Sequence, residues 1–124
     1  MEPKAPIILT VDDESSVRRV IRTVLEREGY SVREASCGTE AIATFESEPD
    51  IALVLSDMRM PGMDGNALGH ALTALRPKVR LMFISAFDQE LDERFRHCAT
   101  LNKPFNNKQL VARVRSQLNL AACA

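Results

Sequence analysis

The order of apolar and amphipathic segments is the feature of this sequence that most constrains its fold. Short apolar runs typical of buried strands alternate five times with stretches of helical periodicity, and no linker or repeat interrupts the series. The runs that we expect to be strands are residues 7–11, 31–34, 50–56, 79–84 and 100–102. Strands that alternate with helices form a parallel sheet covered on both faces. The sequence therefore predicts a single doubly wound α/β domain of the (βα)5 type, which suits a length of 124 residues.

The first three helices are predicted by apolar spacing and by residues that end helices. In the first helix, the apolar residues that share one face are Val17, Val20, Ile21, Val24 and Leu25. Gly29 is expected to end that helix. A second helix is expected over residues 38–47, and a third should end before Pro77.

The last two helices rest on shorter patterns. Phe87, Leu91 and Phe95 lie four residues apart, which predicts a short fourth helix from about Asp88 to His97. The final helix is expected to open with a capping box, in which an asparagine N-cap is followed three residues later by a glutamine. These two residues are Asn106 and Gln109.

Charge and composition exclude several classes of function. The chain carries 16 basic and 17 acidic residues, with no polybasic run and no tryptophan, so we expect no direct nucleic-acid binding by this domain. No apolar stretch is long enough to span a bilayer. The three cysteines, Cys37, Cys98 and Cys123, lack metal-type spacing, and an odd number without a signal peptide fits reduced thiols in the cytoplasm.

Acidic and basic side chains stand at the ends of three of the predicted strands. Asp12 and Asp13 follow the first strand, Asp57 follows the third, and Lys103 follows the fifth. If the strands are parallel neighbours, these residues meet at one edge of the sheet, where open α/β folds bind ligands. Three carboxylates there would repel one another unless a cation lay among them. The pattern therefore predicts a site for a divalent metal ion.

Each of these residues also has an ordinary structural explanation. Asp12 or Asp13 can cap the helix that follows, Asp57 can start a turn, and Lys103 can simply be solvated. Two adjacent acids are harder to explain by capping alone, because one satisfies the cap while the other remains free to bind a hard cation.

Taken together, the set is that of a phosphoryl-transfer site. A carboxylate can accept a phosphoryl group when the donor is held in line and the charge on the equatorial oxygens is neutralised. The three aspartates would hold Mg²⁺, Lys103 would pair with a phosphoryl oxygen, and Ser85 would supply a hydroxyl donor. The backbone carbonyl of Arg59 would add to the metal shell.

Four segments of the chain closely resemble the receiver domain of two-component response regulators, the CheY-like superfamily. They are Val11-Asp12-Asp13-Glu14, the run from Leu55 to Gly65, Ile84-Ser85-Ala86 and Asn102-Lys103-Pro104-Phe105. The resemblance covers essentially the whole chain, so residues 1–124 are expected to form one receiver domain.

The resemblance implies a flavodoxin-like sheet in the order 2-1-3-4-5 and a cis Lys103–Pro104 peptide bond. It also implies that Asp57 is phosphorylated, with Mg²⁺, by a phosphohistidine donor, and that the acyl phosphate then hydrolyses slowly. The donor would be a histidine kinase or a histidine phosphotransfer protein. The output would be a contact with another protein or domain, or a phosphorylation-dependent dimer.

Three features depart from the usual pattern of the family. Such receivers carry an aromatic residue three positions before the lysine, which turns inward when the Ser or Thr hydroxyl engages the phosphoryl group; here that position is Thr100. The interval of eighteen residues between Ser85 and Lys103 is short, so the fourth helix should be shortened or partly unwound. The side chain of Arg59, two after the acceptor, can pair with a phosphoryl oxygen or an acid, or be solvated.

Two other functional classes compete with a phosphoacceptor signalling domain. An aspartyl-phosphate phosphotransferase or phosphohydrolase would use the same acids, metal and lysine on external substrates. Such an enzyme needs a cap over the substrate, and the chain has no insertion large enough to form one. A receiver-like module that binds partners without phosphorylation is disfavoured because every acid and the lysine are intact. We therefore expect a signalling domain rather than an enzyme.

Overall fold

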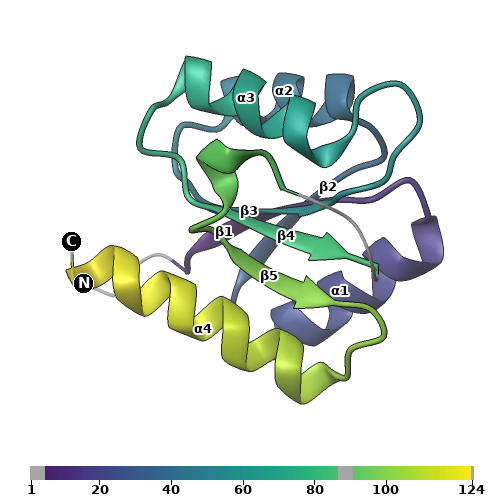
Figure 1. Cartoon of the computed structure of the whole chain (residues 1–124). Helices are drawn as coiled ribbons and strands as arrows, with labels where there is room; N and C mark the ends of the chain where they lie inside the picture. Colours follow the sequence, from purple (N-terminus) through teal and green to yellow (C-terminus); the bar gives the residue numbers. More distant parts are fainter. Residues whose placement is uncertain (1–4, 87–90, 124) are drawn as a thin grey trace.

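A five-stranded parallel sheet forms the centre of the protein. The computed structural model describes residues 5–86 and 91–123. The strands are β1 (Ile7–Val11), β2 (Ser31–Ala35), β3 (Ile51–Asp57), β4 (Leu81–Ser85) and β5 (Ala99–Asn102). They lie in the order β2-β1-β3-β4-β5 (Figure 1), which confirms the expected doubly wound order.

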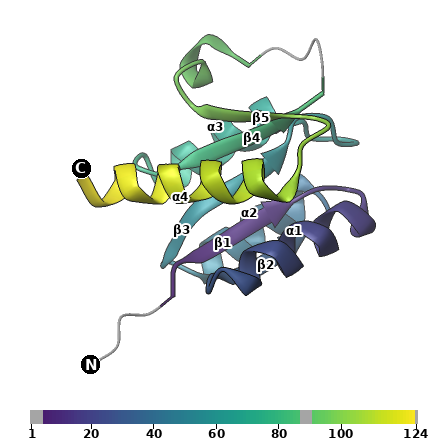
Figure 2. The same cartoon turned by 90° about the horizontal axis from the view of Figure 1, so that it is seen from below.

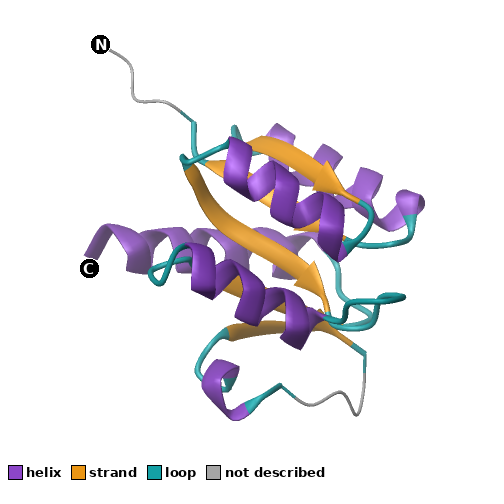
Figure 3. Ribbon diagram, turned by 90° about the horizontal axis from the view of Figure 1, so that it is seen from above, coloured by secondary structure: helices purple, strands orange, loops and turns teal. Residues whose placement is uncertain are grey.

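Four α-helices cover the sheet, two on each face. They are α1 (Ser15–Arg27), α2 (Gly38–Ser47), α3 (Gly65–Leu75) and α4 (Asn107–Cys123). In Figure 2, α1 and α4 lie across one face of the sheet, and Figure 3 looks onto the face that α2 and α3 cover. Successive side chains of a strand point to opposite faces, so the strands contribute to two separate apolar cores.

The ends of several helices follow the sequence signals. Gly29 adopts a positive φ of 93°, a conformation that glycine reaches without a steric cost, directly after α1. The capping box of the last helix forms as predicted. The side chain of Asn106 accepts a hydrogen bond from the backbone N–H of Gln109, and the Gln109 side chain accepts one from the N–H of Asn106.

The prediction of a fourth helix from Asp88 to His97 is wrong for the residues that the structure describes. Residues 88–90 lie outside the described ranges, and from residue 91 onward the segment contains only one 3-10 turn, η1 (Glu93–Phe95). The turn is held by its neighbours, because the N–H of Asp92 donates to the Asn66 side chain at 2.8 Å. Phe95, only 2 % exposed, fills the space above Gly69.

The 3-10 turn explains why the four-residue spacing of Leu91 and Phe95 does not correspond to a helix. The rings of Phe95 and Phe83 lie 5.7 Å apart, and a Cβ atom on Gly69 would come within 2.9 Å of the Phe95 ring. The buried ring of Phe95 and the hydrogen bond from Asp92 to Asn66 thus attach the described part of this connection to α3 without a helical stripe.

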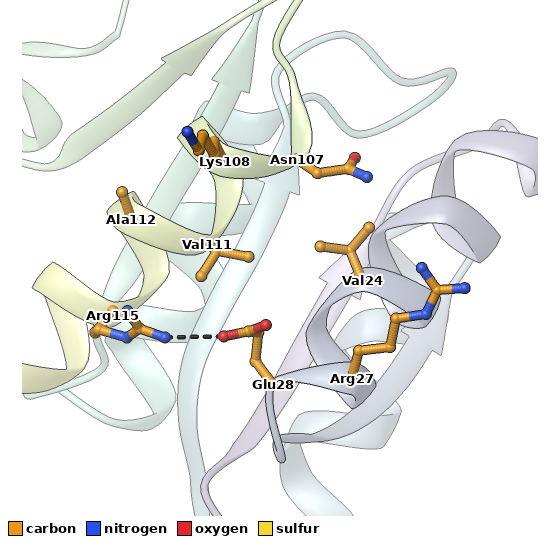
Figure 4. Close-up of a pocket in the computed structure, with 8 residues that line it drawn as sticks. All are labelled: Val24, Arg27, Glu28, Asn107, Lys108, Val111, Ala112 and Arg115. Carbon is orange, nitrogen blue, oxygen red and sulfur yellow. Dashed lines mark hydrogen bonds and ion pairs between the residues drawn. The ribbon is translucent and has the colours of Figure 1, made fainter.

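A cleft of about 450 Å³ separates α1 from α4 on the other face of the sheet. Val24 and Val111 line it together with basic side chains (Figure 4). Arg115 of α4 reaches Glu28, just beyond α1, at 2.8 Å, and this pair ties the two helices together at the surface. Such exposed ion pairs contribute little stability, so apolar packing holds the helices to the sheet.

Among the described residues, no helix has the length and hydrophobicity needed to cross a membrane.

Candidate functional site

The carboxyl ends of the strands bring the predicted acids and the lysine to one place. The register pairs Val11 of β1 with Ser56 of β3, so Asp12 and Asp57, one residue further along each strand, are neighbours. The N–H of Lys103 donates to the carbonyl of Ser85 at 2.8 Å, which continues the pairing of β4 with β5 by one residue. Asp12, Asp13, Asp57 and Lys103 therefore converge as the sequence predicted.

Two of the three carboxylates are buried. Asp12 is 1 % exposed and Asp57 is 5 % exposed, whereas Asp13 lies at the surface. One oxygen from each of the three carboxylates lies within 4.8 Å of the others. The ammonium of Lys103 is 3.5 Å from Asp57 Oδ2 and 3.9 Å from Asp12 Oδ2. Among the described residues, Lys103 thus forms ion pairs with two of the three acids.

Burial governs the acidity of the two buried carboxyl groups, Asp12 and Asp57. It raises the pKa of Asp12 and of Asp57 above their usual value, because a desolvated carboxylate is less stable than a hydrated one. The backbone N–H of Glu14 opposes the effect at Asp12, and the Lys103 ammonium opposes it at Asp57. The charged forms of both carboxyl groups are therefore destabilised by burial, and the neighbouring donors offset this only in part.

Capping does not account for Asp12. The N-cap of α1 is Glu14, whose side chain makes no capping bond, and Asp12 Oδ1 accepts the N–H of Glu14 at 2.9 Å. Asp12 Oδ2 is buried and has no hydrogen-bond partner among the described residues. A buried polar oxygen without a donor costs free energy unless a cation or water satisfies it. This oxygen, beside two other carboxylates, fits the hard oxygen shell of Mg²⁺.

Two of the carboxylates, those of Asp13 and Asp57, line a surface cleft of about 470 Å³. Its lining residues are Asp13, Glu14, Asp57, Arg59, Met60, Pro61, Ala86 and Lys103. The backbone N–H of Arg59 donates to the Asp57 carboxylate, while the Arg59 side chain is exposed and forms no ion pair among the described residues. The cleft is therefore open to solvent, and its volume is large enough for a phosphorylated side chain of another protein to enter.

The loop behind Asp57 depends on a glycine. The N–H of Gly65 donates to the carbonyl of Met58 at 2.9 Å, and a Cβ atom at Gly65 would lie 2.9 Å from Met58 Cα. Only a residue without a side chain allows this approach. Asp64 then caps α3 by accepting the N–H of Ala67 at 2.8 Å. On the other side of the site, the Lys103–Pro104 peptide bond is cis, as the resemblance implied.

Three of the predicted residues, Asp12, Ser85 and Thr100, are not among those that line the cleft, and Ser85 is engaged by a neighbouring strand. It is the last residue of β4 and is 7 % exposed, and its hydroxyl donates to Asn102 Oδ1 at 3.2 Å. The hydrogen bond to Asn102 is not predicted from the sequence, although pairing the predicted ends of β4 and β5 would have indicated it. Thr100, in place of the usual aromatic residue, is half-buried and lies opposite Phe83 in the register.

Comparison with known families identifies the fold and its acidic cleft. The model of the response regulator receiver domain family matches residues 8–115. The chain belongs to this family. It is a receiver domain of two-component systems, and a cluster of aspartates at the carboxyl edge of the sheet is typical of the phosphoacceptor site in such domains.

Several characterised proteins contain similar receiver domains. The chain is 36 % identical over 120 residues to the aerobic respiration control protein ArcA of Escherichia coli, covering 94 % of this chain and 50 % of ArcA. The chain thus spans about half the length of that relative. It is 32 % identical to the response regulator receiver protein CpdR of Brucella abortus, covering 90 % of this chain and 95 % of CpdR.

Solved structures agree with this assignment. The receiver domain of the hybrid histidine kinase CckA is 35 % identical, with a TM-score of 0.77 over 90 % of this chain and 98 % of that one. A receiver domain protein from Clostridium thermocellum is 26 % identical, with a TM-score of 0.85 over 95 % of this chain and 98 % of that one. Relatives therefore include regulators and the receiver domain of a kinase.

Proposed function

We propose that Asp57 is the acceptor of a phosphoryl group from a phosphohistidine. The observation that carries this proposal is the position of its carboxylate, buried at the end of β3 and 3.5 Å from the Lys103 ammonium, with its cleft open to solvent. An Asp57 oxygen attacks phosphorus while the bond from phosphorus to the histidine nitrogen breaks. The imidazole then takes up a proton, and an acyl phosphate is left on Asp57.

Each of the surrounding residues stabilises a different part of the transferred group. Lys103 pairs with a phosphoryl oxygen as a compact positive charge, and Ser85 donates its hydroxyl to another. The carboxylates of Asp12, Asp13 and Asp57, with the backbone carbonyl of Arg59, would hold Mg²⁺. When bound, Mg²⁺ neutralises the charge that develops on the phosphoryl oxygens.

The chain acts as a signalling domain throughout residues 1–124 rather than as an enzyme on external substrates. Its donor is a histidine kinase or a histidine phosphotransfer protein in the cytoplasm. Similarity to the receiver domain of the hybrid histidine kinase CckA supports a kinase as the donor. Phosphorylation changes contacts with an output protein or domain, or favours a dimer. The chain turns over only its own phosphoryl group, which it hydrolyses slowly.

Acetyl phosphate with Mg²⁺ tests this proposal directly. We expect the intact mass of the protein to rise by one phosphoryl group, with no increase in the Asp57→Asn variant. Asp50→Asn provides a matched control, since Asp50 is an exposed carboxyl between α2 and β3. Phosphorylation that persists in Asp57→Asn would refute the assignment of the acceptor. Repeated turnover of a small phosphoester would show an enzyme instead.

A further inference from the structure

The hydroxyl of Ser85 is engaged by a side chain of the neighbouring strand β5. Ser85 is 7 % exposed, and its Oγ donates to Asn102 Oδ1. A buried hydroxyl needs a partner, and Asn102 is the partner in this structure. Ala86 and Lys103 line the cleft, but Ser85 does not. A hydroxyl has a single proton to donate, so it must leave Asn102 before it can donate to a phosphoryl oxygen.

The geometry of this hydrogen bond suits an exchange of partners. At 3.2 Å it is longer than the 2.5–3.0 Å typical of hydroxyl donors, so it is weaker than a hydroxyl hydrogen bond of ideal length. A phosphoryl oxygen is a charged acceptor, and hydrogen bonds to charged groups are stronger than those to a neutral amide. The Ser85 hydroxyl should therefore exchange its hydrogen bond to Asn102 for one to the phosphoryl oxygen.

Asn102 is also linked to the lysine of the site. Ser85 and Asn102 are partners in the register of β4 and β5, and Lys103 follows Asn102 directly. The N–H of Lys103 donates to the Ser85 carbonyl at 2.8 Å. The two consecutive residues therefore hold Ser85 in different ways, one by its backbone carbonyl and the other by its hydroxyl.

We propose that Asn102 is a positioning residue that holds the Ser85 hydroxyl in the unphosphorylated protein and releases it to the phosphoryl group. The exposed amide of Asn102, on edge strand β5, then changes its partner when Asp57 is phosphorylated. This exchange gives β5 a response to phosphorylation although the usual aromatic residue is replaced by Thr100. The inference rests on the proposed function of Asp57.

Beryllofluoride with Mg²⁺, a stable mimic of the phosphoryl group, tests the exchange in a double-mutant cycle. Asn102→Ala leaves the hydroxyl without its competing partner, so beryllofluoride should bind about two- to tenfold more tightly than to the unsubstituted chain. In the Ser85→Ala background, the same substitution should leave the dissociation constant unchanged. An equal effect in both backgrounds, or no tightening, would overturn the inference.

The side-chain amide of Asn102 provides a second readout by NMR. Its proton signals should shift on beryllofluoride binding, and Ser85→Ala alone should shift them in the absence of beryllofluoride. If neither shift occurs, Asn102 and Ser85 do not interact and the inference fails, whatever the fate of Asp57. If beryllofluoride does not bind the unsubstituted chain, the proposed function fails and the exchange fails with it. Asn102→Val, a stronger strand former, repeats the cycle if the alanine variant does not fold.

Discussion

Replacing Asp57 with asparagine should stabilise the protein in buffer without divalent cations. The substitution keeps the shape of the side chain and removes one charge from a cluster in which carboxylate oxygens lie within 4.8 Å of one another. At an effective dielectric constant of about 20, each such pair repels by roughly 3.5 kcal/mol. The attraction between Asp57 and Lys103, at 3.5 Å, is roughly 4.7 kcal/mol on the same scale.

Asp57 takes part in two such repulsions and one attraction, so the charge on Asp57 is unfavourable overall. Because Asp13 is exposed, solvent weakens its share of the repulsion. We therefore expect Asp57→Asn to raise the free energy of unfolding at pH 7 by about 1–2 kcal/mol. The change should be measured by urea denaturation, followed by circular dichroism, in the presence of a chelator.

The pH dependence follows from the direction of the pKa shift. Burial raises the pKa of Asp57 in the folded protein, so the folded state binds the proton more tightly than the unfolded state. The associated stability is fully present below the ordinary pKa of 3.8 and is lost as the pH rises through the raised value. The advantage of Asp57→Asn should thus shrink as the pH falls toward 3.8.

Two comparisons make this prediction specific. Asp50→Asn, at an exposed site, should change the stability by less than about 0.5 kcal/mol. Mg²⁺ should stabilise the unsubstituted chain more than Asp57→Asn, because the variant has lost one ligand and one negative charge. A less stable Asp57→Asn variant in chelator, or an equal gain from Asp50→Asn, would refute the electrostatic reasoning.

Two further substitutions test the neighbouring residues. Lys103→Met leaves the buried carboxylates of Asp12 and Asp57 without their cation, so stability in chelator should fall by about 1–3 kcal/mol, and Mg²⁺ should restore much of it; unchanged stability in urea titrations would contradict this role. Phe95→Ala empties the space above Gly69 and should cost about 3–5 kcal/mol by the same assay, whereas a loss under 1 kcal/mol would mean that the turn does not depend on the ring.

The sequence was most informative where strands end. Strand runs are short and apolar, and their carboxyl ends must meet in a parallel sheet, so the convergence of Asp12, Asp57 and Lys103 followed from the pattern. Their chemical roles, and that of Ser85, are predictions still to be tested. The sheet order came from the family resemblance, which the structure confirms.

The sequence was least informative between β4 and β5. The spacing of Leu91 and Phe95 is compatible with a helix, but a single turn also buries Phe95, and local spacing cannot distinguish the two. The hydrogen bond from Ser85 to Asn102 joins residues seventeen positions apart in the chain and depends on the register of β4 and β5. Such a contact becomes visible only when the sheet is assembled.

Phosphorus should become attached to Asp57 and to no other residue. This can be measured by phosphorylating the protein with acetyl phosphate and Mg²⁺, reducing the acyl phosphate with borohydride, and sequencing the peptides by mass spectrometry. We expect homoserine at position 57, only when Mg²⁺ is present. Homoserine at another aspartate, or none after phosphorylation, would contradict this expectation.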